Sequence, residues 1–335
     1  MTAEDAGAQG ASIFPEFDES FRAGFASFVG RPNAGKSTLT NALVGEKVAI
    51  TSSKPQTTRH TVRGIVNRPG EDGRPGAQLV LVDTPGLHRP RTLLGQRLND
   101  LVIDTLSEVD VVGFCLPADE KIGPGDRFIA AQLTKVPHQR VVALVTKTDK
   151  IPRDQLAEQL IAVDQLGREH LAGEKKQAEG FEAIIPVSAV KGEQVDTVAE
   201  ELARLMPLSP PLYPAGELTD EPETVMVAEL IREAALEDVR DELPHSIAVT
   251  VEEMLPREGR PEDRPLTDVH ATIHVERDSQ KAIIIGRGGS RLKQIGSQAR
   301  EGIRKLLGTP VYLDLHVKVT KEWQRDAKKL GRLGF

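Results

Sequence analysis

A glycine-rich segment near the N-terminus carries the residue types that hold phosphate groups. Residues Gly30-Arg31-Pro32-Asn33-Ala34-Gly35-Lys36-Ser37 match G-x-x-x-x-G-K-[ST], directly after an apolar run and at the start of a helical pattern. Glycines allow backbone N–H groups to converge on phosphate oxygens, and the helix N-terminus adds partial positive charge. We expect Lys36 to reach the β- and γ-phosphates and the Ser37 hydroxyl to bind Mg²⁺. The segment therefore predicts the phosphate site of a nucleotide.

A second motif, Asp83-Thr84-Pro85-Gly86, follows an apolar strand about fifty residues downstream. An Asp at the end of such a strand can hold Mg²⁺ through water, and the Gly86 N–H can contact the γ-phosphate and so sense its presence. The next residue, Leu87, can neither donate nor accept a proton, so other groups must position the attacking water. His88 is a candidate base, but we favour an exposed residue of a switch loop.

Two short motifs near the middle of the chain resemble the base site of TRAFAC-class GTPases, which reads Asn-Lys-x-Asp and Ser-Ala. Here they are Thr146-Lys147-Thr148-Asp149 and Ser188-Ala189. The resemblance implies a guanine site. Asp149 would accept hydrogen bonds from the guanine nitrogens, Lys147 would cover the base, and the Ala189 N–H would donate to the guanine carbonyl. Adenine would leave these buried groups unpaired. Thr146 departs from the pattern, and we expect it to lose the amide that ties the base loop to the phosphate loop, which loosens the nucleotide.

The same resemblance assigns the residues of the hydrolysis step. In related GTPases that share Gly-Arg-Pro-Asn-x-Gly-Lys-Ser, the Asn helps to bind K⁺, which implies that Asn33 holds K⁺ and that turnover is slow and K⁺-stimulated. Gln56-Thr57-Thr58-Arg59-His60 resembles the first switch, and we favour Thr58 over Thr57 as its Mg²⁺ ligand. The predicted catalytic residues are Lys36, Thr58, Gly86 and Asn33, and the predicted metal ligands are Ser37, Thr58 and Asp83.

A second glycine-rich turn, Gly286-Arg287-Gly288-Gly289, lies between two helical patterns in the C-terminal part. Glycines let a backbone approach a sugar-phosphate chain closely, and basic side chains neutralise it. The predicted RNA-binding residues are Gly286, Arg287, Gly288, Gly289, Arg291 and Lys293. Nearby Ile283, Ile284 and Ile295 are candidates for an apolar groove, although each is better explained as core.

The charge distribution supports a basic surface at one end of the chain. The net charge is −7, yet Arg277 to Phe335 holds 14 Lys/Arg against 5 Asp/Glu. The preceding part therefore carries a net charge of −16. Such asymmetry between halves is typical of a nucleic-acid-binding module.

Alternating β-branched runs and helical patterns predict a doubly wound α/β domain in the first part of the chain. Strands are predicted at Phe25–Val29, Thr61–Val66, Leu79–Val82, Val109–Leu116, Val141–Val145 and Ala183–Val187. Helices are predicted at Lys36–Val44, Leu94–Ser107, Asp126–Leu133, Arg153–His170 and Gln194–Leu205. The scarcity of aromatic residues, 4% of the chain, fits Val/Ile/Leu cores of a largely parallel sheet.

The C-terminal part has a different element order. A proline-rich segment at 207–221 predicts an extended linker. Then follow a helix, two strands, two helices around the glycine turn, and a strand, predicted at Glu223–Val239, Ser246–Glu253, Leu266–Glu276, Ser290–Leu307 for the second of the two helices, and Val311–Val319. This order resembles a type II KH domain, which clamps about four unpaired nucleotides. The predicted domains are a disordered leader (1–23), a GTPase domain (24–206), the linker, and a KH domain with a basic C-terminal tail (222–335).

In order and spacing these motifs resemble the bacterial Era family, in which a Ras-like P-loop GTPase domain precedes a small α+β type II KH domain. The likeness runs from about Gly24 to Phe335. It implies GTP/GDP, Mg²⁺ and K⁺ as ligands, the 3′ end of 16S rRNA and the 30S subunit as partners, and a monomer acting in ribosome assembly. It also implies a cytoplasmic protein with peripheral association to the inner membrane, for which the sequence offers only the basic tail, Lys318 to Arg332.

Two other functions remain open from the sequence alone. One is a constitutive RNA-binding scaffold whose nucleotide is structural, and the other is a GTPase acting on a protein or a tRNA-modifying partner. Other classes are disfavoured. No apolar stretch approaches the ~20 residues of a membrane helix, the N-terminus is not a signal peptide, and the single cysteine, Cys115, fits a buried residue in a reducing compartment.

Overall fold

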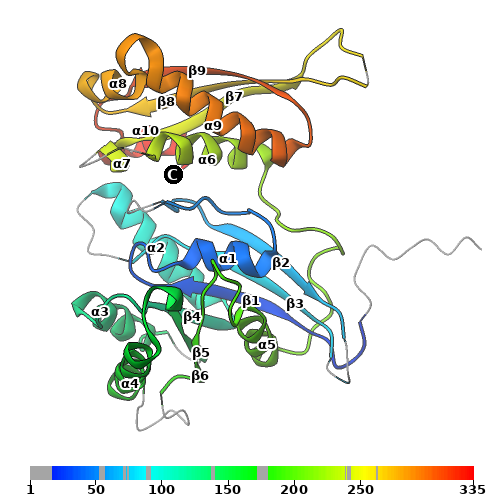
Figure 1. Cartoon of the computed structure of the whole chain (residues 1–335), viewed down its shortest axis with the longest axis vertical. Coiled ribbons are helices and arrows are strands. Elements are labelled where there is room, and N and C mark those ends of the chain that lie inside the picture. Colours follow the sequence, from blue (N-terminus) through cyan, green and yellow to red (C-terminus); the bar gives the residue numbers. More distant parts are fainter. Residues whose placement is uncertain are drawn as a thin grey trace, which may run out of the picture.

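The computed structural model describes residues 17–52, 57–70, 73, 75–87, 92–136, 140–171, 180–237, 239, 243–261 and 263–335. Two bodies follow one another along the long axis of the molecule, the N-terminal α/β domain below and the smaller C-terminal domain above (Figure 1). Both parts of the predicted fold class, a doubly wound P-loop domain and a KH-type α+β domain, are confirmed. The predicted leader falls largely on residues 1–16, which lie outside the described part, as do Gln56 and His88.

The N-terminal domain is built on a six-stranded sheet with the order β2-β3-β1-β4-β5-β6. The strands are β1 (Arg22–Val29), β2 (Val62–Arg68), β3 (Ala77–Asp83), β4 (Val111–Pro117), β5 (Arg140–Thr146) and β6 (Ala183–Pro186). Only β2 runs antiparallel, because it forms a hairpin with β3. The parallel strands β1, β3, β4 and β5 end at the same edge, which is where the predicted phosphate, metal and base motifs meet.

Helices cover both faces of this sheet. Helices α1 (Lys36–Val44) and α5 (Val195–Leu205) pack on one face. Helices α2 (Leu93–Glu108), α3 (Pro124–Leu133) and α4 (Arg153–His170) pack on the other. Strands β3 and β4 are buried along their whole length, so their apolar residues are continuous rather than alternating. Cys115 in β4 is fully buried, and burial raises the pKa of its thiol to about 12.

The linker is fastened to the first domain rather than free. Leu208 pairs with Arg22 at the start of β1, and the Gln78 side chain accepts from the backbone N–H of Leu212 and of Tyr213 at 2.7 and 2.9 Å. Further along, the Ile65 N–H donates to the Leu218 carbonyl at 2.9 Å. The linker therefore reaches the second domain along a defined path down one side of the molecule (Figure 1).

The C-terminal domain has a three-stranded sheet, β7-β8-β9, in which β7 and β8 are antiparallel and β8 and β9 are parallel. Its elements are α6 (Glu223–Leu236), α7 (Leu243–Ser246), β7 (Ala248–Pro256), β8 (Thr267–Val275), α8 (Asp278–Ile285), the 3₁₀ turn η2 (Arg287–Gly289), α9 (Ser290–Leu307) and β9 (Val311–Val319). Helix α6 ends three residues earlier than predicted. Val239 is buried in this core, so its apolar character reflects packing and not a continuing helix.

The segment predicted as a basic tail is folded. A 3₁₀ turn, η3 (Trp323–Arg325), and helix α10 (Ala327–Arg332) follow β9. Trp323, Leu330 and Leu333 are buried in a cluster with Leu94 and Leu98 of α2, so this segment forms part of the contact between the domains. The prediction of a simple tail was incomplete because counting its charges concealed the apolar residues between them.

Candidate functional site

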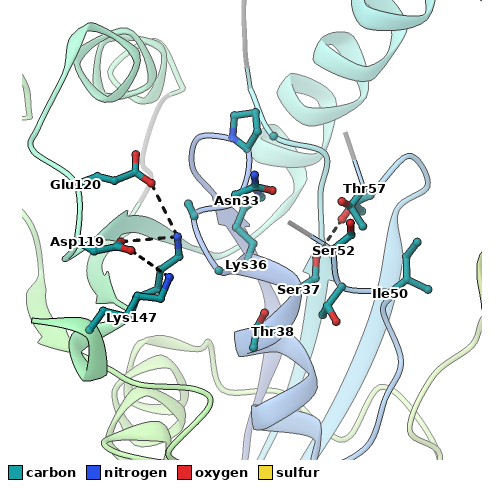
Figure 2. Close-up of a pocket in the computed structure, with 17 residues that line it drawn as sticks. Asn33, Lys36, Ser37, Thr38, Ile50, Ser52, Thr57, Asp119, Glu120 and Lys147 are labelled. Atoms are coloured by element: carbon teal, nitrogen blue, oxygen red, sulfur yellow. Dashed lines mark hydrogen bonds and ion pairs between the residues drawn. The ribbon is translucent and has the colours of Figure 1, made fainter. Parts of the chain in front are cut away.

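A cavity of about 450 Å³ opens at the carboxyl edge of the large sheet. This volume is in the range of small-molecule sites. Its lining combines the phosphate loop, the first switch and the loops after β3, β4 and β5, as Figure 2 shows for the residues that it labels. The lining residues are Pro32–Thr38, Ile50, Thr51, Ser52, Thr57, Thr58, Gly86, Asp119, Glu120, Lys147 and Lys150.

The phosphate loop encloses the lysine that was predicted to contact phosphate. The Lys36 ammonium is 6% exposed and donates to the carbonyls of Gly30 and Arg31 at 3.3 and 3.2 Å. Burial lowers the pKa of Lys36, although the nearby Asp83 carboxylate opposes this shift. An anion in the cavity would supply the charge partner that burial makes valuable. Gly86 lies so close to this loop that a Cβ atom would approach the Pro32 nitrogen to 2.9 Å, which explains why a glycine stands there.

Three oxygen donors from separate elements converge beside the phosphate loop. The Ser37 hydroxyl donates to Asp83 Oδ2 at 2.6 Å, and Thr58 Oγ1 lies 3.0 Å from Ser37 Oγ and 3.2 Å from Asp83 Oδ2. Asp83 is fully buried, and burial raises the pKa of its carboxyl group. Within the described residues its second oxygen, Oδ1, has no hydrogen-bond partner. Hydroxyl and carboxylate oxygens are the ligands that Mg²⁺ prefers, so these residues fit the metal that the sequence predicted.

Of the two adjacent threonines, Thr58 is therefore the one whose hydroxyl reaches the predicted metal site. Thr57 lines the cavity as well, and its carbonyl accepts a hydrogen bond from Arg232 of α6.

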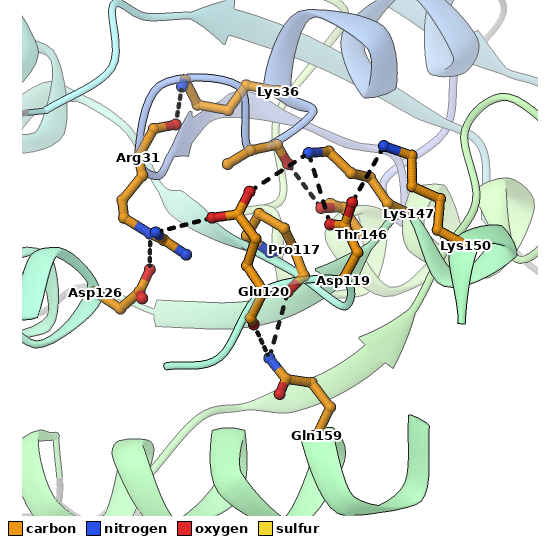
Figure 3. A network of polar contacts seen from close by, with 11 residues as sticks. Arg31, Lys36, Pro117, Asp119, Glu120, Asp126, Thr146, Lys147, Lys150 and Gln159 are labelled. Carbon is orange, nitrogen blue, oxygen red and sulfur yellow. Dashed lines mark hydrogen bonds and ion pairs between the residues drawn. The ribbon is translucent and has the colours of Figure 1, made fainter. Parts of the chain in front are cut away.

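Arg31 of the phosphate loop is clamped by two acids from the region after β4. Its Nε donates to Asp126 at 2.8 Å, and its Nη1 lies 3.0 Å from Glu120 (Figure 3). Asp126 is fully buried and also accepts from the Gly123 N–H at the start of α3 at 2.8 Å. Sequence reasoning missed this clamp, because its partners lie about ninety residues from Arg31 and carry no motif.

Lys147 projects into the cavity beside two of the same acids. Its ammonium lies 3.7 Å from Asp119 and 3.9 Å from Glu120, and Lys150 lies 3.1 Å from Asp119 (Figure 3). Asp119, Glu120 and Lys150 were not predicted as site residues. Their position after a parallel strand at the edge that holds the phosphate loop was the one signal that could have suggested them.

Thr146 retains a tie between the base loop and the phosphate loop. Its hydroxyl donates to the Ala34 carbonyl at 2.7 Å, and the side chain is 4% exposed. The expectation that the tie is lost was wrong, because a hydroxyl also donates a hydrogen bond and here is close enough to reach the loop.

The other residues predicted for the base lie at the same end of the sheet but outside the cavity lining. The Ser188 hydroxyl donates to Asp149 Oδ1 at 2.6 Å, which orients that carboxylate, and Thr148 begins the 3₁₀ turn η1 (Thr148–Lys150). Leu87 is 4% exposed and packs in the core with Val102 of α2, so its side chain does not line the cavity. Thr84 donates to the Phe28 carbonyl at 2.9 Å and has a structural role.

The glycine turn of the C-terminal domain projects from the start of α9. Gly286, Gly288 and Gly289 have φ angles of 74°, 60° and 80°, which favour glycine. Arg287, Gly288 and Lys293 are exposed, whereas Arg291 donates to the Glu237 carbonyl at 2.6 Å. Of the three isoleucines, Ile284 and Ile295 are buried in the core and Ile283 is 51% exposed, so only Ile283 is available to a ligand.

A phosphate loop and a hard-oxygen metal site on a doubly wound sheet define a P-loop nucleotide-binding protein, here joined to a KH fold. The family model described as "50S ribosome-binding GTPase" matches residues 25–147, and the KH domain model matches residues 242–324. GTPase Era of Streptomyces coelicolor is 67% identical over 94% of this chain and 95% of its own length. GTPase Era of Mycolicibacterium paratuberculosis is 63% identical over 94% of this chain and 99% of its own.

Solved structures agree with these relatives. Era in complex with MgGDPNP and nucleotides 1506–1542 of 16S ribosomal RNA is 36% identical, with a TM-score of 0.85 over 94% of this chain and 99% of that one. A variant of Aquifex aeolicus Era bound to GDP and AlF₄⁻ is also 36% identical, with a TM-score of 0.84 over 93% and 99%. The chain belongs to the Era family of GTPases.

Proposed function

We propose that this chain hydrolyses GTP, binds the 3′ end of 16S rRNA through its KH domain, and acts in assembly of the 30S subunit. The observation that carries the proposal is the convergence of Lys36, Ser37, Thr58 and Asp83 on one cavity. The likeness to an Era structure that contains MgGDPNP and 16S rRNA supports the choice of ligands.

Guanine is the proposed base. Asp149, oriented by Ser188 at 2.6 Å, would accept from the guanine ring and amino groups, and Lys147 would cover the ring. The Ala189 N–H would donate to the guanine carbonyl. Adenine lacks the two donors that Asp149 needs, so its binding would leave a carboxylate unpaired.

The hydrolysis step rests on charge and position rather than on a proton-accepting side chain. Lys36 neutralises the β- and γ-phosphates, and the backbone N–H of Gly86 holds the γ-phosphate in line for attack. Ser37, Thr58 and Asp83 would hold Mg²⁺, which when bound neutralises phosphate charge. Leu87 packs in the core and takes no part in proton transfer.

K⁺ is the proposed second cation, held beside the phosphates by Asn33. Asn33 lines the cavity with a φ of 63°, and no residue was identified from sequence as an arginine finger. A monovalent cation there would neutralise transition-state charge. We expect hydrolysis to be faster in KCl than in NaCl, and Asn33→Ala to remove the difference. Equal rates in the two salts for the unmodified protein would contradict the assignment.

RNA is the proposed ligand of the glycine turn. The exposed Arg287 and Lys293 would neutralise phosphates, and the backbone of Gly286–Gly289 would lie against the strand. Footprinting on 16S rRNA and on purified 30S subunits tests the target. Protection confined to the 3′ end supports the proposal, whereas protection of tRNA or of no RNA favours a different GTPase partner.

The two activities are proposed to be coupled, so that RNA is held with GTP and released after hydrolysis. Phosphate release from GTP, together with RNA affinity measured with a GTP analogue and with GDP, tests the switch. A constitutive scaffold predicts bound nucleotide, no phosphate release and one RNA affinity in both states.

We also propose that the protein acts as a cytoplasmic monomer with peripheral association to the inner membrane. No helix in the described ranges is long and apolar enough to cross a membrane. The exposed cations of the C-terminal segment, Lys321, Arg325, Lys328 and Arg332, would meet anionic lipid. Sedimentation with phosphatidylcholine vesicles, with and without phosphatidylglycerol, and light scattering of the protein alone test these two points.

A further inference from the structure

The segment that lines the metal side of the cavity is held by the KH domain at three places. The Thr51 N–H donates to Glu233 Oε1 of α6 at 2.9 Å, the Thr57 carbonyl accepts from Arg232 of α6, and Arg59 Nη1 donates to the Ile247 carbonyl at 2.6 Å. Thr51 and Thr57 are themselves lining residues. The placement of the first switch therefore depends on a domain outside the nucleotide site.

Arg59 is the most deeply inserted of these contacts. Its side chain is 1% exposed, and its guanidinium carbon lies 5.6 Å from the Trp323 ring centroid and 5.9 Å from that of Phe335. The Trp323 indole N–H donates to the Ser246 carbonyl at 3.1 Å, next to the residue that accepts from Arg59. The guanidinium is thus held between a carbonyl of the KH domain and two stacked rings.

The neighbouring residue in the chain is the predicted metal ligand. Thr58 contacts Ser37 and Asp83, whereas Arg59 contacts only residues 247, 323 and 335 among the printed partners of its guanidinium. Because one peptide bond joins them, a displacement of Arg59 from its pocket must displace Thr58 from the oxygen cluster.

The charges around Arg59 favour a contact that can be released. Arg232 is also 1% exposed, and the buried acid Glu229 pairs with it at 2.5 Å. Two buried guanidinium groups thus share one buried carboxylate, and burying a charge without a full partner is costly. The docked state is therefore balanced against an undocked state in which water solvates Arg59.

We propose that Arg59 is the positioning residue that couples the KH domain to the magnesium site. The inference rests on the proposed function and names the residue that transmits it. When the KH domain is seated, Arg59 and Arg232 fix the backbone on both sides of Thr58, and its hydroxyl faces Asp83. Metal binding at Thr58 in turn favours the seated domain, since coupling is reciprocal.

The test compares Arg59→Ala, Arg59→Lys and the matched control Arg63→Ala in the full chain. Arg63 is four residues away, 48% exposed, and pairs with Asp220 of the linker at 2.8 Å. For Arg59→Ala we expect kcat to fall and the Mg²⁺ concentration for half-maximal hydrolysis to rise, each about tenfold, as for loss of one charged hydrogen bond. Arg59→Lys should recover part of both, and Arg63→Ala should match the unmodified protein.

A binding measurement separates positioning from a merely structural role. The ratio of affinities for a single strand copying the 16S 3′ end, with GTP analogue against GDP, should collapse toward one in Arg59→Ala. Wild-type Mg²⁺ dependence and an unchanged ratio in that variant would overturn the inference. If Arg59→Ala does not fold, Phe335→Ala decides, because it removes only one ring: smaller shifts in the same directions support the inference, and none overturn it. Absence of hydrolysis or of RNA binding in the unmodified protein would instead contradict the proposed function.

Discussion

The molecule has two glycine-rich turns, each at the start of a helix, that differ in how firmly their surroundings hold them. In the phosphate loop Lys36 is buried, Arg31 is clamped by Asp126, and Thr146 holds the Ala34 carbonyl. In the KH turn Arg287 is exposed, and a Cβ atom on Gly288 would meet open space. An enclosed, preformed loop suits a compact polyphosphate, whereas an open turn suits a polymer that must enter and leave across a surface.

The largest effect is expected from removing the charge inside the enclosed turn. Lys36→Ala leaves phosphate charge without its buried cation, so kcat/KM for GTP should fall at least about 10²-fold, the cost of one transition-state charge contact. Phosphate release measures this rate. The melting temperature without nucleotide is the control for folding, and a variant within tenfold of the unmodified rate would show that Lys36 does not carry the phosphate charge.

A smaller, ligand-specific effect is expected at the open turn. Gly288 has a φ of 60° and a ψ of 25°, a region that Asp and Asn tolerate better than other residues. Gly288→Asp places an anion against the RNA backbone, while Gly288→Asn adds the same volume without charge. We expect RNA affinity to fall about tenfold more for Asp than for Asn, and more at low salt, with unchanged hydrolysis in the absence of RNA.

Filter binding at two salt concentrations makes this comparison. Equal losses for the two variants would show that the backbone volume at the turn, rather than its charge environment, determines binding.

The smallest effect is expected where a hydroxyl replaces the usual amide. Thr146→Val keeps the shape and removes the 2.7 Å hydrogen bond to Ala34, leaving a buried carbonyl short of a donor. Affinity for GDP should fall by about 1 kcal/mol, or roughly fivefold, as measured by fluorescent-nucleotide displacement. Thr146→Asn serves as the conservative variant, and an unchanged affinity in Thr146→Val would mean that the tie contributes nothing to nucleotide binding.

The difference between the turns also marks what the sequence could predict. Both turns, the metal motif and nearly all strands and helices were predictable, because each is encoded by residues adjacent in the chain. The Arg31–Asp126 clamp and the Arg59–Ile247 contact were not, since they join residues that lie 95 and 188 positions apart. Such pairs are set by tertiary packing, which no local pattern records.

The C-terminal segment shows a signal that was present but overlooked. It contains the single tryptophan of the chain, Trp323, which is fully buried against the first domain. Tryptophan is strongly buried on average, so a segment with such a residue is poorly described by its charge alone. Leu330 and Leu333, spaced as on one helix face, complete the pattern.

The central claim is that the nucleotide site and the RNA-binding domain act as one switch. Its most direct test is GTP hydrolysis in KCl buffer with and without a short single strand that copies the 3′ end of 16S rRNA. The account predicts hydrolysis that rises with the RNA, and a smaller rise in Arg59→Ala. Bound GTP with no phosphate release in either condition, or a rate indifferent to the RNA, would contradict it.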